Sequence, residues 1–158
     1  MKRKVMLASL CLMIPAAVVA ADNWPQFRGP NAAGNSPERN LPEKFGPNEN
    51  IRWKTSLPGR GLSCPVIANG KVFLTANSGM DQNRLHVLAL DLATGKQLWE
   101  RQFWATGQTL CHPKTCMACP TVVTDGQMVF ALFATGDLVG LSADGDVKWV
   151  RSLSTEYP

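Results

Sequence analysis

The segment ALDLATGKQLW, residues Ala89–Trp99, decides the fold because it contains a turn between two predicted strands. The flanking residues extend this pattern to RLHVLALDLATGKQLWERQF, in which short apolar runs lie on either side of Asp91–Gly95. Aspartate in such a turn accepts hydrogen bonds from nearby backbone N–H groups, and glycine tolerates the left-handed backbone that turns require. We therefore predict two antiparallel strands joined at Asp91–Gly95, with the Asp91 carboxylate capping the turn.

A second copy of this pattern follows at Gly140–Trp149, GLSADGDVKW, which keeps Gly145 and Trp149 but lacks the threonine and is one residue shorter. Trp53, Trp99 and Trp149 recur at spacings of 46 and 50 residues. Self-similarity at this period is typical of repeat architectures.

Each of the two repeats also begins with a predicted hairpin. CPVIANGKVFLTAN turns at Asn69-Gly70, and CPTVVTDGQMVFALFA turns at Asp125-Gly126. Dipeptides of this kind between apolar runs are strong hairpin signals. We expect Cys64-Pro65 and Cys119-Pro120 to open equivalent first strands.

Four strands per repeat predict an all-β protein, a β-propeller of four-stranded blades. A single blade cannot bury both of its faces, so each blade needs a neighbour on either side. We expect the tryptophan of each outer strand to dock against the adjacent blade, with its indole N–H bonded to a turn carbonyl.

The turn segment resembles the repeat signature of the pyrroloquinoline-quinone-like (PQQ-like) β-propellers, A-x-D-x-x-T-G-x-x-x-W. The match is full and rests on Ala89, Asp91, Thr94, Gly95 and Trp99. The segments WPQFRGPNAAGNSPERNLPEKF and IRWKTSLPGRGLSCPVIANGKVFLT resemble the start of an exported bacterial branch of this family. At fold level the resemblance extends to the propeller lipoprotein of outer-membrane assembly. It implies seven or eight blades in the full-length protein, so we expect an N-terminal fragment whose remaining blades are missing.

The patterns divide the chain into six predicted parts. They are a signal peptide (1–21), an irregular Pro/Asn/Gly-rich leader (22–50), a propeller-closing strand (51–57), a first blade (58–104), a cysteine-containing connector (105–118) and a second blade with the start of the next connector (119–158). We expect apolar side chains to hold the leader on a neighbouring surface, namely Trp24, Phe27, Leu41 and Phe45.

The first residues predict export, because a basic start is followed by an apolar run and small residues. Cleavage would leave no membrane-spanning segment and place the protein in the periplasm, in the cell envelope or outside the cell. Three of the 16 basic residues lie in the signal, so 13 remain against 12 acidic residues. This near-balance argues against nucleic acid as a partner.

The connector sequence CHPKTCMAC holds three of the five cysteines with the spacing C-x4-C-x2-C. This spacing is compatible with iron–sulfur or zinc ligation by Cys111, His112, Cys116 and Cys119. Export favours disulfides over such clusters. Of the three pairings that four cysteines allow, we favour Cys111–Cys116, which would staple the connector, and we expect His112 to form hydrogen bonds there.

The resemblance concerns the repeat and not the active site of the quinoprotein dehydrogenases. No residue here matches the tryptophan floor, the acidic calcium ligands or the adjacent cysteines that hold PQQ in those enzymes, so we assign no catalytic residue and no cofactor to this segment. We predict a non-catalytic scaffold that binds a protein or a cell-envelope component. The alternatives are a PQQ-dependent oxidoreductase whose site lies in other blades, and a metal or redox site at Cys111–Cys119.

Overall fold

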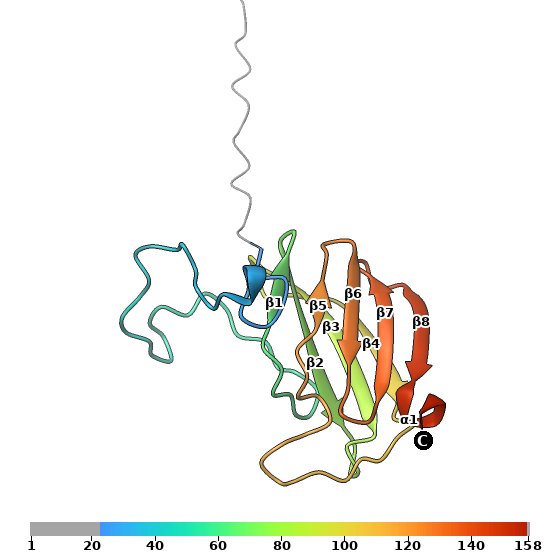
Figure 1. The fold of residues 1–158 in the computed structure, drawn as a ribbon. Coiled ribbons are helices and arrows are strands. Elements are labelled where there is room, and N and C mark those ends of the chain that lie inside the picture. Colours follow the sequence, from blue (N-terminus) through green and yellow to red (C-terminus); the bar gives the residue numbers. More distant parts are fainter. Residues whose placement is uncertain (1–22, 158) are drawn as a thin grey trace, which may run out of the picture.

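The computed structural model describes residues 23–157, and the predicted signal peptide lies outside them. Two four-stranded antiparallel sheets form the molecule, each with its strands in sequence order (Figure 1). The elements are η1 (Pro30–Ala32), β1 (Val66–Ala68), β2 (Lys71–Ser78), β3 (Arg84–Asp91), β4 (Gln97–Trp104), β5 (Val123–Thr124), β6 (Met128–Leu132), β7 (Asp137–Ser142), β8 (Val147–Ser152) and α1 (Leu153–Glu156). The predicted all-β fold is confirmed.

The main core lies between the two sheets, which pack side by side as neighbouring blades (Figure 1). Successive side chains of a strand point to opposite faces. One face of β3 therefore points toward the second blade, with Leu85, Val87 and Ala89 completely buried. The other face holds Leu88 and Leu90, which join a smaller cluster on the far side of the first blade.

Residues 51–57, predicted to be a closing strand, form no strand in the structure. A strand exists only when its backbone bonds to a partner, and no strand of residues 23–157 pairs with this segment. Trp53 nevertheless packs against the outer cluster of the first blade. The tryptophan position was therefore predicted correctly, but the element was not.

The leader is irregular, as its prolines predict, and a large part of it loops away from the sheets (Figure 1). Trp24 joins the start of the leader to the first blade by a β-bridge, exchanging two backbone hydrogen bonds of 2.8 and 2.9 Å with Ile67 of β1. Phe27, Leu41 and Phe45 are each more than half exposed. The expectation that all four apolar side chains hold the leader in place is therefore wrong for these three.

The register of the sheets corrects the equivalence expected for Cys64 and Cys119. Val66 of β1 pairs with Phe73, and Val123 of β5 pairs with Phe130. This register makes Cys64 equivalent to Thr121, because both lie two residues before these valines. Cys119 lies further from its strand, because Thr121 and Val122 stand between Pro120 and Val123 whereas Pro65 directly precedes Val66.

Candidate functional site: the blade junction and the connector face

Trp53 and Trp99, the first two tryptophans of the repeat, are each bonded to the blade that follows. The Trp53 indole N–H donates to the Leu92 carbonyl at 2.9 Å, and the Trp99 indole N–H donates to the Ala143 carbonyl at 3.1 Å. Leu92 and Ala143 both lie in the turn between the third and fourth strands of a blade. The expected docking is confirmed for both tryptophans, and it fixes the distance between successive blades.

The glycine of the repeat is required by this docking. Gly95 and Gly145 have φ of 70° and 90°, a left-handed backbone that glycine adopts readily. A Cβ atom at Gly95 would lie 2.4 Å from the Trp53 ring, and one at Gly145 would lie 2.7 Å from the Trp99 ring. The glycine therefore supplies both the turn and the space for the indole.

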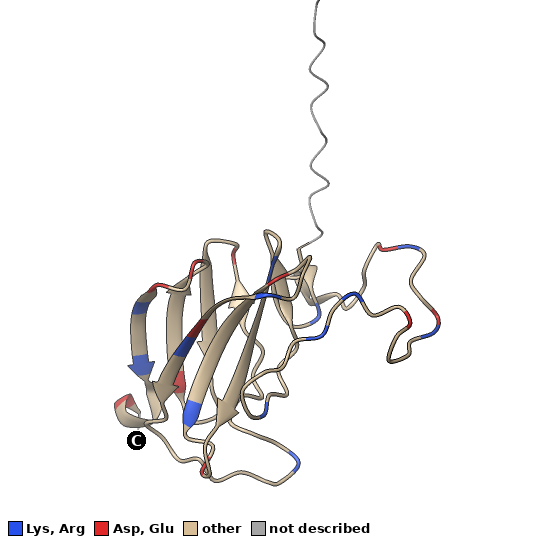
Figure 2. Cartoon of the chain, turned by 180° about the vertical axis from the view of Figure 1, so that it is seen from behind, with Lys and Arg blue, Asp and Glu red and all other residues tan. Residues whose placement is uncertain are grey.

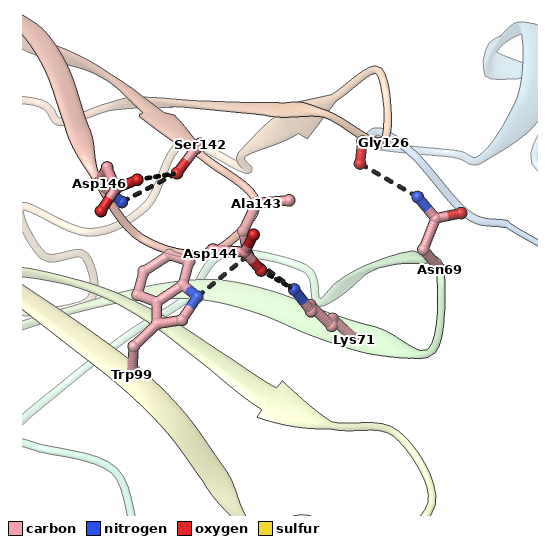
Figure 3. A network of polar contacts seen from close by, with 8 residues as sticks. All are labelled: Asn69, Lys71, Trp99, Gly126, Ser142, Ala143, Asp144 and Asp146. Atoms are coloured by element: carbon pink, nitrogen blue, oxygen red, sulfur yellow. Dashed lines mark hydrogen bonds and ion pairs between the residues drawn. The ribbon is translucent and has the colours of Figure 1, made fainter.

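Further polar contacts join the two blades at the end where the tryptophans dock, between turns of the first blade and turns of the second (Figure 3). Lys71 donates to the Asp144 carboxylate at 2.6 Å and to the Ala143 carbonyl at 3.1 Å. Asn69 donates its side-chain amide to the Gly126 carbonyl at 3.0 Å. The hydrogen bond and the charge of Lys71 hold the pKa of Asp144 below its ordinary value.

Turn carboxylates act within their own blade as well. Asp91 accepts hydrogen bonds from the Thr94 amide at 2.8 Å and from its hydroxyl at 2.6 Å, which confirms the predicted cap. The Thr94 hydroxyl is the largest cause of the lowered pKa of Asp91. Asp125 accepts from the amides of Gln127 and Met128 in the second hairpin turn.

At the opposite end of the blades, three loops form a surface that we call the connector face. It consists of the β2–β3 turn (79–83), the β6–β7 turn (133–136) and the whole segment between β4 and β5 (105–122), which is longer than the predicted connector and is called the connector from here on. Asp137 fastens the connector to the second blade. This carboxylate is buried and accepts from the Thr106 amide and hydroxyl and from the Thr135 hydroxyl.

The segment 116–118 is buried between the two blades. The Ala118 amide donates to the Asn77 side chain of the first blade at 3.1 Å. The Met117 carbonyl accepts from the Ala134 amide of the second blade at 2.9 Å. The connector is therefore bonded to both sheets and does not hang as a free loop.

All four cysteines of residues 23–157 are free thiols in this structure. The two sulfurs of the predicted Cys111–Cys116 bridge have other neighbours here: that of Cys111 accepts a hydrogen bond from Gln82, and that of Cys116 lies 3.9 Å from the Cys119 sulfur. His112 accepts a hydrogen bond from the Lys114 amide within the connector, as expected. Within residues 23–157, no three His, Cys, Asp or Glu side chains are close enough to hold a metal ion.

The thiols of Cys116 and Cys119 differ in their electrostatic surroundings. Burial raises the pKa of the Cys116 thiol, and Cys119 beside it raises this pKa further. Burial alone would also raise the pKa of Cys119, but hydrogen bonds from Thr115 and Cys116 and the charge of Arg60 hold it below its ordinary value. A thiolate is thus favoured at Cys119 over Cys116.

A hydrogen-bonded chain of Ser78, His86 and Glu100 lies on the outer face of the first blade. The His86 ring is 2.8 Å from the Ser78 hydroxyl through Nε2 and 2.6 Å from the Glu100 carboxylate through Nδ1. The order of groups is that of a Ser–His–acid triad. However, His86 is only 2% exposed, so we interpret these bonds as satisfying a buried histidine.

The connector face carries the two most exposed large apolar side chains of the described residues. Met80 is 100% exposed and Leu110 is 92% exposed. Both line a shallow cavity of about 250 Å³ together with Asp81, Gln82, Thr109 and Cys111. This site was not predicted from the sequence, although a large apolar residue within the polar turn NSGMDQN indicates one.

Charged residues are distributed without a dominant sign over the part of the chain that the structure describes. Figure 2 shows acidic and basic residues interspersed along the leader, the turns and the outer strands. No helix of residues 23–157 is long and apolar enough to cross a membrane.

Two four-stranded blades, joined by a tryptophan that docks onto the turn glycine of the next blade, define a segment of a PQQ-like β-propeller. Residues 47–157 match the family model described as "Outer membrane protein assembly factor BamB". The match covers more than half of the chain, and the chain therefore belongs to this family.

The chain is also similar to individual proteins. The chain is 29% identical to the outer membrane protein assembly factor BamB of Xanthomonas campestris pv. campestris over 99% of its own length, and it spans 38% of that relative. The crystal structure of BamB from Moraxella catarrhalis is 23% identical, with a TM-score of 0.45 over 63% of this chain and 26% of that one. A europium-containing methanol dehydrogenase is 21% identical, with a TM-score of 0.38 over 55% and 14% of the two chains.

The quinone cofactor after which the repeat is named does not fit the described residues. The PQQ enzymes hold their cofactor beside a calcium ion bound by acidic side chains. Residues 23–157 bring no three such ligands together, and the aspartates Asp91, Asp125 and Asp137 are instead occupied by turn and connector hydrogen bonds.

Proposed function

We propose that this chain is part of an exported, non-catalytic β-propeller scaffold of the cell envelope, whose connector face binds a partner protein. The proposal rests on two large apolar side chains, Met80 and Leu110, that are almost completely exposed to solvent beside a cavity on that face. The family, described as an outer membrane protein assembly factor, supports a role in binding other envelope proteins.

The physical argument rests on solvation and rigidity. Holding large apolar side chains in water is unfavourable, and clustered exposed apolar groups commonly mark interaction sites. Methionine is well suited to such a surface because its flexible, polarisable side chain adapts to a partner. The loops that present Met80 and Leu110 are attached to two packed sheets, and binding loops on rigid scaffolds are a common arrangement.

The test uses the full-length protein and two substitutions, Met80→Asp and Leu110→Asp. We expect each to reduce crosslinking to its envelope partner at least tenfold, because a carboxylate would have to be desolvated at the interface. Both side chains are exposed, so the thermal melting temperature should change little. Leu41→Asp is the matched control, since Leu41 is also exposed but lies in the leader. Equal crosslinking by all three variants and the wild type would refute the proposal.

Export is tested separately by cell fractionation of the full-length protein. We expect the protein in the envelope or periplasmic fraction and a loss of export when Lys2, Arg3 and Lys4 are replaced by glutamate, because a basic start is needed for export. Recovery of the wild-type protein from the cytoplasm would contradict the proposed location.

A further inference from the structure

We propose that Cys116 and Cys119 form a redox-active dithiol pair that undergoes thiol–disulfide exchange with a disulfide-bearing protein. This site goes beyond the proposed scaffold function and does not depend on it. It rests on the geometry of the C-x-x-C turn, on the unequal exposure of the two thiols and on the groups around Cys119.

The two sulfur atoms are close enough to be joined by a small local movement. They lie 3.9 Å apart, and the Cys116 amide also donates to the Cys119 sulfur at 3.3 Å. A disulfide bond is about 2.05 Å long. Closing it requires the sulfurs to approach by roughly 2 Å, a distance that side-chain rotation within a four-residue turn can supply.

The exposure of the two thiols assigns a different role to each. Cys119 is partly exposed and can reach a disulfide outside the protein, whereas Cys116 is 0% exposed. Thr115 and Arg60 lie beside Cys119 and favour its thiolate, as the lowered pKa of this group indicates. The thiolate is the nucleophile in exchange reactions, so Cys119 is the attacking residue and Cys116 the resolving residue.

The oxidant is the disulfide of the incoming protein. The Cys119 thiolate attacks one sulfur of the incoming disulfide, forming a mixed disulfide and releasing the first thiolate. Cys116 then loses its proton and attacks the Cys119 sulfur, which forms the Cys116–Cys119 bond and releases the second thiolate. Two cysteine thiols are oxidised, and one disulfide is reduced to two thiols.

The location gives the bridge a structural consequence. Residues Met117 and Ala118, between the two cysteines, are bonded to Ala134 of the second blade and to Asn77 of the first. A bridge across this turn would restrict the segment that ties the connector to both blades. Oxidation is therefore expected to raise the resistance of the connector to proteolysis.

The experiment treats the full-length, reduced protein with glutathione disulfide and maps its thiols by alkylation and mass spectrometry. In the wild type we expect a loss of two thiols and one Cys116–Cys119 disulfide. In Cys116→Ser, which cannot resolve the intermediate, we expect glutathione to remain on Cys119. In Cys119→Ser, glutathionylation of Cys116 should be at least tenfold slower. Cys111→Ser is the matched control and should form the bridge as the wild type does.

Several outcomes would overturn the proposal. They are a wild type that keeps its thiols, a bridge between another pair of cysteines, or a Cys116→Ser variant in which Cys64 or Cys111 is glutathionylated faster than Cys119. The wild-type mapping requires no substitution, so it decides the matter even if a serine variant fails to fold.

Discussion

At the scale of single residues, the junction between units depends on one contact, made by the indoles of Trp53 and Trp99 against the turn glycines Gly95 and Gly145. We predict that Gly145→Ala destabilises the protein by about 2–4 kcal/mol, from a left-handed backbone penalty and from the clash with Trp99. Gly70→Ala is the control, because Gly70 also has positive φ, at 74°, but nothing lies within 4 Å of its added Cβ. It should lose only about 1 kcal/mol. Urea unfolding of the three proteins provides the measurement.

If both alanine variants lose the same free energy of unfolding, glycine is needed at position 145 only for its left-handed backbone. The contact with Trp99 would then have no part in selecting this residue, and the docking distance between blades would have to be set elsewhere, for example by Lys71 and Asp144.

At the scale of elements, the tryptophan hydrogen bond joins the fourth strand of one blade to a turn of the next. We predict that Trp99→Phe costs about 1 kcal/mol, because the ring can still pack but the bond to Ala143 is lost. The described residues provide no carbonyl for the Trp149 indole. If a further blade follows in the full-length protein, Trp149→Phe should cost as much there as Trp99→Phe. Thermal melts of both variants in the 158-residue chain and in the full-length protein test this.

The ion pair between Lys71 of β2 and Asp144 of the β7–β8 turn gives a pH-dependent contribution to stability. The folded-state pKa of Asp144 lies below the ordinary value of 3.8, so the contribution is present above 3.8 and is lost as the pH falls through the folded-state pKa. We predict that Asp144→Asn lowers the melting temperature slightly at neutral pH and that the difference disappears in acid. Because Asp144 is exposed, added salt should also reduce it.

Lys71→Met provides the second arm of a double-mutant cycle for this pair. The double variant should lose less than the sum of the two single variants at neutral pH. Strictly additive losses at low salt would mean that Lys71 and Asp144 do not interact across the junction.

The elements also show what sequence could and could not predict. Hairpins and the Asp91 turn were predictable because their determinants are local, namely turn residues and alternating apolar positions. The segment 51–57 was not, since strand formation depends on a partner and not on the segment itself. The buried bonds of Asp137 were also missed, because they depend on how the connector folds back between the blades.

At the scale of the whole molecule, two stacked blades leave the outer faces of the pair differently covered. The far face of the first blade is covered in part by Trp53 and Leu57, which line an apolar cavity of about 280 Å³ with Val72 and Leu74. On the far face of the second blade, Leu132 of β6 and Trp149 of β8 remain 39% and 37% exposed. In a complete propeller each such face would be buried against a neighbouring blade.

This uncovered face predicts the behaviour of the 158-residue chain in isolation. Exposed apolar side chains and an unpaired strand edge favour association between copies, so we expect the chain alone to form dimers or larger species in size-exclusion chromatography with light scattering. Leu132→Asp should shift it toward monomer, because the charge would be buried in the contact, while Leu110→Asp, on the connector face, should not. A monodisperse monomer with a cooperative melt would contradict this prediction, and would mean that two blades of this family suffice for a stable fold.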